Sequence, residues 1–315
     1  MLARDGIARD SLPRLGRPCY DSGTMNTVGM IGLGLLGHAL ASRLLASGHA
    51  VIGYDVLPEK IDALTRIGGT PVSSVADVAT RAEIVCVVLP TLASVEDAIV
   101  GPAGIVAHGK ASSIIVQMST ISPVLTERLA RDVAARGLGF LDGPVSGTSA
   151  MVARGDGLII AGGDSSVFER CRPVLAAMLP RVVYIGPAGH ATLVKLVANL
   201  LVAVHSVAAA EALTMARKAG VDLTRTLEIL ASGAAGSRML DVRGPMIVDE
   251  RFPPQMKLDL FMKDLHLIQD AARAVGAPIP LTDVSERLYA AALDAGHGGE
   301  DLSVVVQALA QSRSA

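Results

Sequence analysis

Short apolar runs alternate with amphipathic stretches between residues 27 and 187 of the 315-residue chain. Such alternation is typical of buried strands connected by covering helices. Strands are predicted at six places: 28–31, 50–54, 83–89, 113–118, 158–163 and 182–185. After about Ala219 the strand pattern disappears. Helices are predicted there at 223–230, 257–275, 281–293 and 302–310. The chain should therefore consist of an α/β domain followed by an all-α domain.

The longest apolar stretch, residues 188–213, joins these two parts. It is rich in Ala and Leu and contains no Pro, so one helix of about seven turns is predicted. Its only formal charge between His190 and Glu211 is Lys195. At about 100° per residue, three more polar side chains fall within about 60° of this lysine: Thr192, Asn199 and Ser206. Because a buried lysine is costly without a cleft or a partner, this polar stripe is predicted to face a cleft.

Bulk composition limits the classes of partner. Apolar residues make up 50% of the chain and charged residues 18%, so a folded chain with a large core is expected. The net charge of −2 and the aromatic content of 3% argue against binding to nucleic acid. The three cysteines are scattered, without the spacing of metal ligands, which is typical of a reducing cytoplasm. A cytoplasmic protein without a metal site is predicted.

Mean hydropathy is high, at +0.47, so a membrane span has to be considered. The helix predicted over 188–213 is the best candidate by length, but its Lys, Asn, His and Ser side chains would be costly at bilayer depth. A buried helix between domains or subunits is therefore predicted instead of a span. Ala-rich helices that bury against another copy would explain the hydropathy, and a homodimer or homotetramer is expected.

The first 24 residues carry four arginines and two prolines but no long apolar run. They lack the apolar segment of a secretory signal, and a disordered tail is predicted for residues 1–25. Met25 directly precedes the first strand and is a candidate start of the working protein.

A glycine-rich loop follows the first predicted strand: Gly32-Leu33-Gly34-Leu35-Leu36-Gly37. Between a strand and a helix, this spacing is the fingerprint of a dinucleotide-binding Rossmann unit. The first glycine allows a tight turn, the second lets the backbone approach a pyrophosphate, and the third lets the helix pack closely. We therefore predict a Rossmann domain over 26–188 that binds the cofactor through these six residues. An all-helical domain over 189–315 should follow, beginning with an inter-domain helix over 189–218.

Asp55 lies at the end of the second predicted strand, 18 residues after Gly37. A carboxylate there accepts hydrogen bonds from the ribose hydroxyls of NAD and repels the 2′-phosphate of NADP. The next three residues include no Arg that could hold this phosphate, although Lys60 could reach it. The sequence therefore predicts NAD as the cofactor, with NADP as the less favoured alternative.

Four blocks together resemble the β-hydroxyacid dehydrogenase family, from Val28 to about Ala310. The first is the glycine loop with Asp55. The second is Leu89-Pro90 with Met118-Ser119-Thr120. The third is Asp142-Gly-Pro-Val-Ser-Gly147, and the fourth runs from Gly186-x-x-Gly189 through Lys195 and Asn199 to Lys263-Asp264. The C-terminal half looks most like the tartronate semialdehyde reductases of this family.

The resemblance implies an active site between the two domains and a role for each matching residue. Lys195 matches the catalytic lysine and Asn199 the asparagine that orients the substrate. Ser146 and Gly147 match the residues that hold the substrate carboxylate, to which the backbone of Thr148 is added. The remaining matches are cofactor contacts: Leu89, Pro90, Thr120 and Lys263. Spacing alone instead favours Lys263 as an exposed partner of Asp259.

The substrate-binding loop departs from the family pattern. Gly would be usual at the positions of Thr148 and Met151, and Ala at that of Val152. These larger side chains are expected to narrow or reshape the carboxylate end of the pocket, so the exact substrate stays open. Tartronate semialdehyde, methylmalonate semialdehyde, succinate semialdehyde and threonate all fit.

The resulting hypothesis is an oxidoreductase that interconverts a small 3-hydroxy acid and its semialdehyde. Burial and nearby positive charge would lower the pKa of Lys195 and suit it to move a proton at the carbinol oxygen. Three alternatives remain: a 6-phosphogluconate dehydrogenase-like enzyme, an imine reductase-like enzyme and a non-catalytic dinucleotide-binding module. The first has His before the asparagine, where this chain has Ala198, and the other two tend to lack the lysine.

Overall fold

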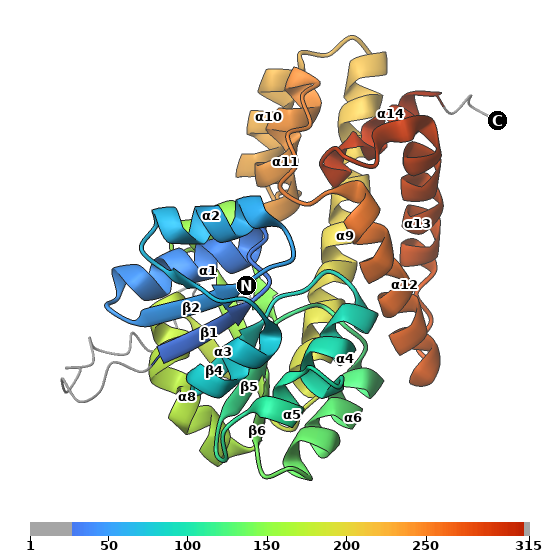
Figure 1. The fold of residues 1–315 in the computed structure, drawn as a ribbon. Coiled ribbons are helices and arrows are strands. Elements are labelled where there is room, and N and C mark those ends of the chain that lie inside the picture. Colours follow the sequence, from blue (N-terminus) through green and yellow to red (C-terminus); the bar gives the residue numbers. More distant parts are fainter. Residues whose placement is uncertain (1–26, 312–315) are drawn as a thin grey trace, which may run out of the picture.

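A computed structural model describes residues 27–311 of the chain (Figure 1). Its N-terminal part is a twisted sheet with strand order β3-β2-β1-β4-β5-β6-β8-β7, in which β9 pairs with β8. The strands from β3 to β6 are parallel, whereas β8 runs antiparallel to β6 and β7. The strands are β1 Thr27–Ile31, β2 Ala50–Tyr54, β3 Thr70–Pro71, β4 Ile84–Val87, β5 Ile114–Gln117, β6 Gly139–Asp142, β7 Val145–Ser146, β8 Leu158–Gly163 and β9 Val182–Tyr184. This is a Rossmann-like domain, as predicted.

Helices cover both faces of this sheet, and successive strand residues pack alternately against them. Val28 and Met30 join the core under α1 and α8, whereas Ile31 joins the opposite core under α3, α4 and α6. Because both faces are buried, the strands read as unbroken apolar runs in the sequence. The helices of this part are α1 Leu35–Ala46, α2 Pro58–Arg66, α3 Val75–Arg81, α4 Leu92–Val100, α5 Ile105–His108, α6 Pro123–Ala134, α7 Ser149–Ala153 and α8 Ser165–Met178.

Helix α9, His190–Lys218, runs from the sheet into a helical C-terminal part (Figure 1). Near its beginning, Thr192 bonds to Thr126 of α6, with 3.2 Å between the two hydroxyl oxygens. Farther along, Ala203 and Leu213 are buried in the core of the C-terminal helices. These helices are α10 Leu223–Ser232, α11 Arg238–Asp249, α12 Leu258–Ala274, α13 Pro280–Ala292 and α14 Val305–Gln311, with short η1 Leu293–His297 and η2 Leu302–Val304 segments.

Helix α9 is long and apolar enough to cross a membrane, and 44% of its most apolar window is buried within the protein. Its packing partners lie in both parts of the chain, which agrees with the predicted helix between domains. All four members of the polar stripe are buried: Thr192, Lys195, Asn199 and Ser206.

The structure also contains elements that the apolar pattern did not predict. Helices α8 and α11 each contain a proline, Pro173 and Pro245, which the sequence pattern treats as a helix breaker. The two-residue strands β3 and β7 are too short to have an apolar period. The predicted tail, Met25 and Cys19 lie outside the described residues, whereas Cys86 and Cys171 are buried free thiols.

Candidate active site

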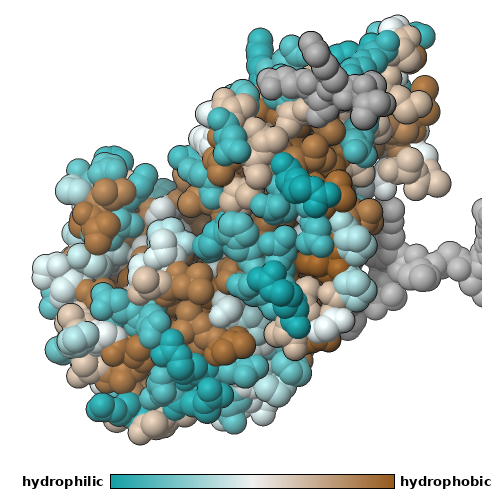
Figure 2. All heavy atoms as spheres, turned by 90° about the vertical axis from the view of Figure 1, so that its right-hand side faces the viewer, coloured by the Kyte–Doolittle hydropathy of each residue, from teal (hydrophilic) through white to brown (hydrophobic). Residues whose placement is uncertain are grey.

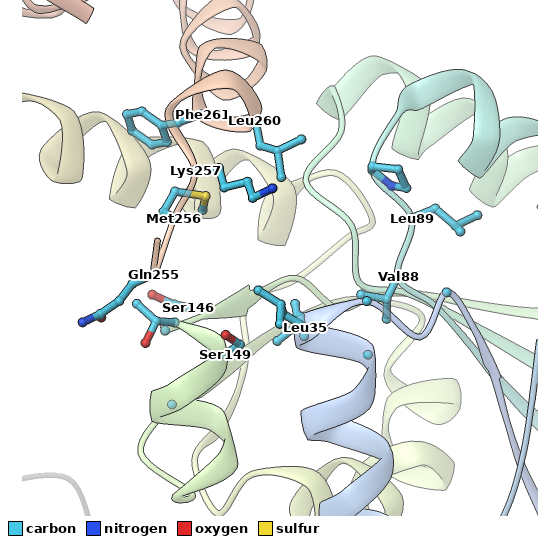
Figure 3. Close-up of a pocket in the computed structure, with 18 of the residues that line it drawn as sticks. Leu35, Val88, Leu89, Ser146, Ser149, Gln255, Met256, Lys257, Leu260 and Phe261 are labelled. Atoms are coloured by element: carbon cyan, nitrogen blue, oxygen red, sulfur yellow. The ribbon is translucent and has the colours of Figure 1, made fainter. Parts of the chain in front are cut away.

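A cavity of about 1290 Å³ lies between the glycine loop and the C-terminal helices. Figure 3 shows Leu35, Ser146 and Ser149 on one side of it and Met256, Lys257 and Leu260 on the other. Most of the residues predicted for the site line this cavity: Gly32, Gly34, Leu35, Leu36, Gly37, Asp55, Leu89, Pro90, Ser146, Gly147, Thr148, Lys195 and Asn199. The structure therefore brings together residues that are up to 167 positions apart in the sequence.

The glycine loop makes the tight turn from β1 into α1. Gly32 has φ +90°, and a Cβ placed there would lie 2.1 Å from the carbonyl oxygen of Val88, so only glycine fits. Gly34 is the N-cap of α1, and no side chain of the described residues caps the helix at this end. The first backbone N–H groups of α1 therefore remain available at the cavity wall, as an anionic ligand requires.

The carboxylate of Asp55 closes the other side of this loop. It accepts hydrogen bonds from the backbone N–H of Leu33, at 2.7 Å, and of Leu57, at 3.0 Å. Asp55 is half-buried and lines the cavity together with Lys60. A fixed carboxylate at the end of β2 is the arrangement that binds ribose hydroxyl groups.

Three predicted cofactor residues do not line the cavity. Leu33 is 1% exposed, its side chain lies in the core, and its N–H is bonded to Asp55. Thr120 and Lys263 contact each other instead, since Nζ of Lys263 donates to the carbonyl oxygen of Thr120 at 2.7 Å. Lys263 also pairs with Asp264, at 3.3 Å, so the alternative pairing with Asp259 is wrong.

Lys195 lies on the cavity wall with only 8% of its surface exposed. Burial lowers its pKa, the carboxylate of Asp264 opposes this effect, and the charge of Lys263 adds to it. One turn farther along α9, Nδ2 of Asn199 donates to Oδ2 of Asp264 at 2.8 Å. Burial also raises the pKa of Asp264, which the two lysines lower in turn. Lys195, Asn199 and Asp264 thus form one buried polar group.

Asp264 was not assigned a role from the sequence, although it stands beside Lys263 in the family block. Asp264 itself does not line the cavity, but other polar residues without an assigned role do: Asp97, Asp156, Arg181, Arg238, Arg243, Gln255 and Lys257. Two of these lie on α11, the helix that Pro245 concealed in the sequence. The sequence pattern did not predict α11, so it could not predict that these two arginines face the cavity.

The loop after β7 explains two of the three departures from the family pattern. Thr148 is the N-cap of α7, and its hydroxyl accepts from the N–H of Met151 at 3.2 Å. Thr148 and Met151 both line the cavity, as expected. Val152 instead points into the core with 0% exposure and does not line the cavity, so its expected effect on the pocket was wrong.

Asp142, at the end of β6, anchors the start of α9. Its carboxylate accepts from the N–H of Gly189 at 3.0 Å and of Thr192 at 2.9 Å. The hydroxyl of Thr192 donates to the same carboxylate at 2.7 Å, which gives this member of the polar stripe a structural role. Burial raises the pKa of Asp142 to about 6, against the opposing effect of these hydrogen bonds.

This shift predicts a pH-dependent stability. The unfolded carboxyl loses its proton near 3.8 and the folded one near 6, so raising the pH between these values should lower the free energy of unfolding. At 1.36 kcal/mol per pH unit, the loss is about 3 kcal/mol. The measurement is urea unfolding of the wild type and of Asp142→Asn from about pH 4 to pH 7. The stability of the wild type relative to the variant should fall through this window and stay constant above it.

Asp164→Asn is the matched control. Asp164 also caps a helix, α8, but it is exposed and hydrogen bonding to Ser166 lowers its pKa. The contribution of Asp164 to stability is lost only as the pH falls through values below 3.8. The difference in free energy of unfolding between the wild type and Asp164→Asn should therefore stay nearly constant from about pH 4 to pH 7. If the free energy of unfolding changed with pH in the same way in all three proteins, the role of Asp142 would be contradicted.

Both halves of the chain match known protein families. Residues 27–186 match the model described as the NAD binding domain of 6-phosphogluconate dehydrogenase. Residues 189–309 match the model described as NAD-binding of NADP-dependent 3-hydroxyisobutyrate dehydrogenase.

Whole proteins are similar as well. L-threonate dehydrogenase of Cupriavidus necator is 33% identical over 89% of this chain and 95% of its own length. For 2-hydroxy-3-oxopropionate reductase of Escherichia coli the identity is 34% over 79% of this chain and 85% of that protein. The crystal structure of 3-hydroxyisobutyrate dehydrogenase from Salmonella typhimurium has a TM-score of 0.83 and 31% identity, covering 90% of this chain and 99% of that one.

Proposed function

Because this chain belongs to the β-hydroxyacid dehydrogenase family and is an NAD(P)-dependent oxidoreductase, we propose that it interconverts a small 3-hydroxy acid and its semialdehyde with NAD. The substrate would belong to the tartronate semialdehyde or methylmalonate semialdehyde class. One observation carries the proposal. A buried lysine with a lowered pKa, Lys195, lines the same cavity as the N-terminus of α1.

The residues around the glycine loop fit a dinucleotide. A Cβ at Gly34 would have no atom of residues 27–311 within 4 Å, so this part of the chain leaves open space over the N-terminus of α1. The backbone N–H groups there would hold the pyrophosphate, and Asp55 would accept from the adenosine ribose. Leu89 and Pro90 would contact the cofactor from the end of β4. When bound, the nicotinamide ring supplies or accepts the hydride.

Lys195 acts as the general acid and base in this proposal. In the reducing direction its ammonium group donates a proton to the aldehyde oxygen, and in the oxidising direction its neutral amine takes the proton from the carbinol. Burial lowers the pKa of the lysine and so reduces the free-energy cost of its neutral form. Beside it, the opposite charges of Asp264 and Lys263 form an ion pair, with 3.3 Å between Oδ1 and Nζ.

Asn199 and the loop after β7 orient the substrate. The hydrogen bond to Asp264 fixes the amide of Asn199, and its oxygen and second N–H, which have no side-chain partner between residues 27 and 311, would bond to the substrate. The backbone amides of Ser146, Gly147 and Thr148 hold the carboxylate. Lys263 would contact the cofactor through the third N–H of its ammonium group, beside its contacts to Thr120 and Asp264.

A substrate panel tests the proposal. The purified protein is assayed with NAD and NADH against 3-hydroxyisobutyrate, L-threonate and glycerate, and against tartronate, methylmalonate and succinate semialdehydes. The absorbance of the reduced cofactor is followed. Turnover of at least one of these compounds is expected. Turnover of 6-phosphogluconate or of a cyclic imine alone would favour one of the alternative enzymes and contradict the proposal.

The cofactor preference is a separate prediction. Asp55 should repel the 2′-phosphate of NADP, so kcat/KM with NADH should exceed that with NADPH by about tenfold or more. Steady-state rates with each cofactor at saturating semialdehyde measure this ratio. The Asp55→Ser variant should lower the ratio of kcat/KM with NADH to that with NADPH. It removes a hydrogen-bond acceptor for NADH and the repulsion of the NADPH phosphate. Equal efficiencies in the wild type, with Lys60 as the phosphate ligand, would overturn the assignment.

A cytoplasmic homodimer or homotetramer remains part of the proposal. Apolar side chains are exposed on the C-terminal helices, with Leu281 at 67% and Val284 at 45% on α13 and Val197 at 53% on α9. Figure 2 shows hydrophobic patches among hydrophilic residues on the side of the molecule where α13 lies. A second copy would bury such residues. Sedimentation velocity measures the assembly directly.

A further inference from the structure

The cavity contains a buried arginine that the proposed mechanism does not use. Arg243 lies on α11, is 2% exposed and lines the cavity with Lys195 and Asn199. A buried guanidinium normally has an acceptor for each of its N–H directions, because it cannot lose its charge. Its hydrogen bonds therefore indicate what the cavity lacks.

Protein groups satisfy only part of this guanidinium. Nε donates to Oδ1 of Asp301 at 3.1 Å, and Nη1 donates to the sulfur of Met239 at 2.7 Å. Sulfur is a weak acceptor. Nη2 has no acceptor among residues 27–311, although Arg243 borders the cavity. An oxygen of a bound ligand would complete the set.

The charge of Arg243 is already compensated. Asp301 is fully buried, and it also accepts from the backbone N–H groups of Met256, at 3.0 Å, and Ser303, at 3.0 Å. A second carboxylate on the ligand would therefore bring an additional buried negative charge. A hydroxyl oxygen accepts the hydrogen bond without adding charge. The neutral pair of Arg243 and Asp301 thus favours a hydroxyl group over a carboxylate and over a methyl group.

Arg243 acts on a tyrosine, Tyr289, that is hydrogen-bonded to the part of α9 beyond Asn199. Val202 continues the cavity wall there, and the next residue, Ala203, accepts from the hydroxyl of Tyr289 at 3.1 Å. The charge of Arg243 acts on this tyrosine, whose pKa burial raises and Arg243 lowers. Four residues of helix from Asn199 to Ala203 correspond to about 6 Å. A substrate that Asn199 orients could therefore extend by a few carbon atoms toward this part of the cavity wall.

We propose that Arg243 determines the specificity of this enzyme by donating a hydrogen bond to a hydroxyl group at the far end of the substrate. The inference rests on the proposed function and narrows it. The preferred substrate is then a short polyhydroxylated acid, and an alkyl-branched acid such as 3-hydroxyisobutyrate is disfavoured because it would leave the guanidinium donor unmet.

The test uses L-threonate as a substrate that is oxidised at a secondary carbinol, C2 or C3, to a keto acid, so that its terminal hydroxyl is not the reacting group. L-Threonate is compared with 4-deoxy-L-threonate, which lacks only this terminal hydroxyl, and with 3-hydroxyisobutyrate. In the wild type, kcat/KM for L-threonate should exceed that for the deoxy compound by about 10- to 100-fold, as expected for one charge-assisted hydrogen bond. Arg243→Lys keeps the positive charge beside Asp301 but lacks the forked donor. In Arg243→Lys the ratio of kcat/KM for L-threonate to that for the deoxy compound should fall to within a few-fold of one, because kcat/KM for L-threonate decreases.

Two further variants separate specificity from folding. Arg243→Met with Asp301→Asn removes both charges together, so a ratio near one in this double variant supports the proposal even if Arg243→Lys is unstable. Arg217→Lys is the control, because Arg217 is likewise an arginine with hydrogen bonds at α11, to Glu250 at its end and to the carbonyl of Ile247, but does not line the cavity. Its ratio should equal that of the wild type.

The outcomes distinguish the two levels of the proposal. If the wild type oxidises no hydroxy acid with NAD or NADP, the proposed function fails. If it oxidises L-threonate and the deoxy compound equally well, or prefers 3-hydroxyisobutyrate, only the role of Arg243 is overturned. The role is also overturned if the wild-type ratio is large and remains unchanged in a folded Arg243→Lys protein.

Discussion

Replacing Lys195 by alanine is expected to lower kcat by about 10²- to 10⁴-fold, the usual contribution of a positioned acid or base. The affinity for NAD should change little, because the predicted pyrophosphate and ribose contacts come from α1 and Asp55. Steady-state turnover and titration of NADH fluorescence measure the two effects separately. Near-normal turnover would refute the role of this lysine.

The pH profile supplies a second readout for Lys195. Because its pKa is lowered, the neutral amine needed for oxidation should persist to a lower pH than for an exposed lysine. Oxidation should lose activity as the pH falls through this lowered pKa, and reduction should lose activity as the pH rises through it. Both limbs should be absent from the residual activity of Lys195→Ala. Asp264 shares the site, so the apparent values belong to the group of residues.

Two single substitutions in the glycine loop are expected to separate binding from folding. A Cβ at Gly37 would lie 2.1 Å from the carbonyl oxygen of Gly32, which is backbone and cannot rotate away. Gly37→Ala should therefore lower the free energy of unfolding by at least about 1–3 kcal/mol. It should also weaken the binding of the cofactor. Urea unfolding without ligand measures this loss.

Gly34→Ala should have the opposite character. A Cβ at Gly34 meets no atom within 4 Å in the part of the chain that the structure describes, and its backbone, at φ −59°, suits alanine. The loss of a favourable N-cap residue is offset by a less flexible unfolded chain, so stability should change by less than about 1 kcal/mol. The methyl group would instead occupy the space where the pyrophosphate approaches, and cofactor affinity should fall about 5- to 150-fold. Unchanged affinity for NADH would place the cofactor elsewhere.

Much of the candidate site could be predicted because it depends on local order. The spacing from Gly32 to Gly37 requires only the strand before it and the helix after it. The buried state of Lys195 and Asn199 follows from one helical period on an apolar helix, and all four members of that stripe are buried. In both cases the relevant neighbours lie within one element or at its ends.

The remainder depends on contacts between distant segments. The roles of Thr192 and Asp142 come from a pairing across 50 residues that no local pattern contains. Val152 looks in sequence like a pocket residue, yet the turn of α7 directs it into the core. Arg243 was concealed by Pro245 and by a partner, Asp301, 58 residues away. A buried arginine cannot be distinguished from an exposed one until its helix is placed.

The length of α9 has an evolutionary consequence. Asp142 anchors its first turn to the cofactor half, and the C-terminal helices pack around its second half, so one continuous helix fixes the separation of the two. Inserting a single residue after Asn199 would rotate everything beyond it by about 100° and shift it by about 1.5 Å. Arg243 would then no longer face the same cavity as Lys195. Members that acquire new substrates are therefore expected to change side chains on α11 and in the segment before α12, and to conserve the number of residues in α9.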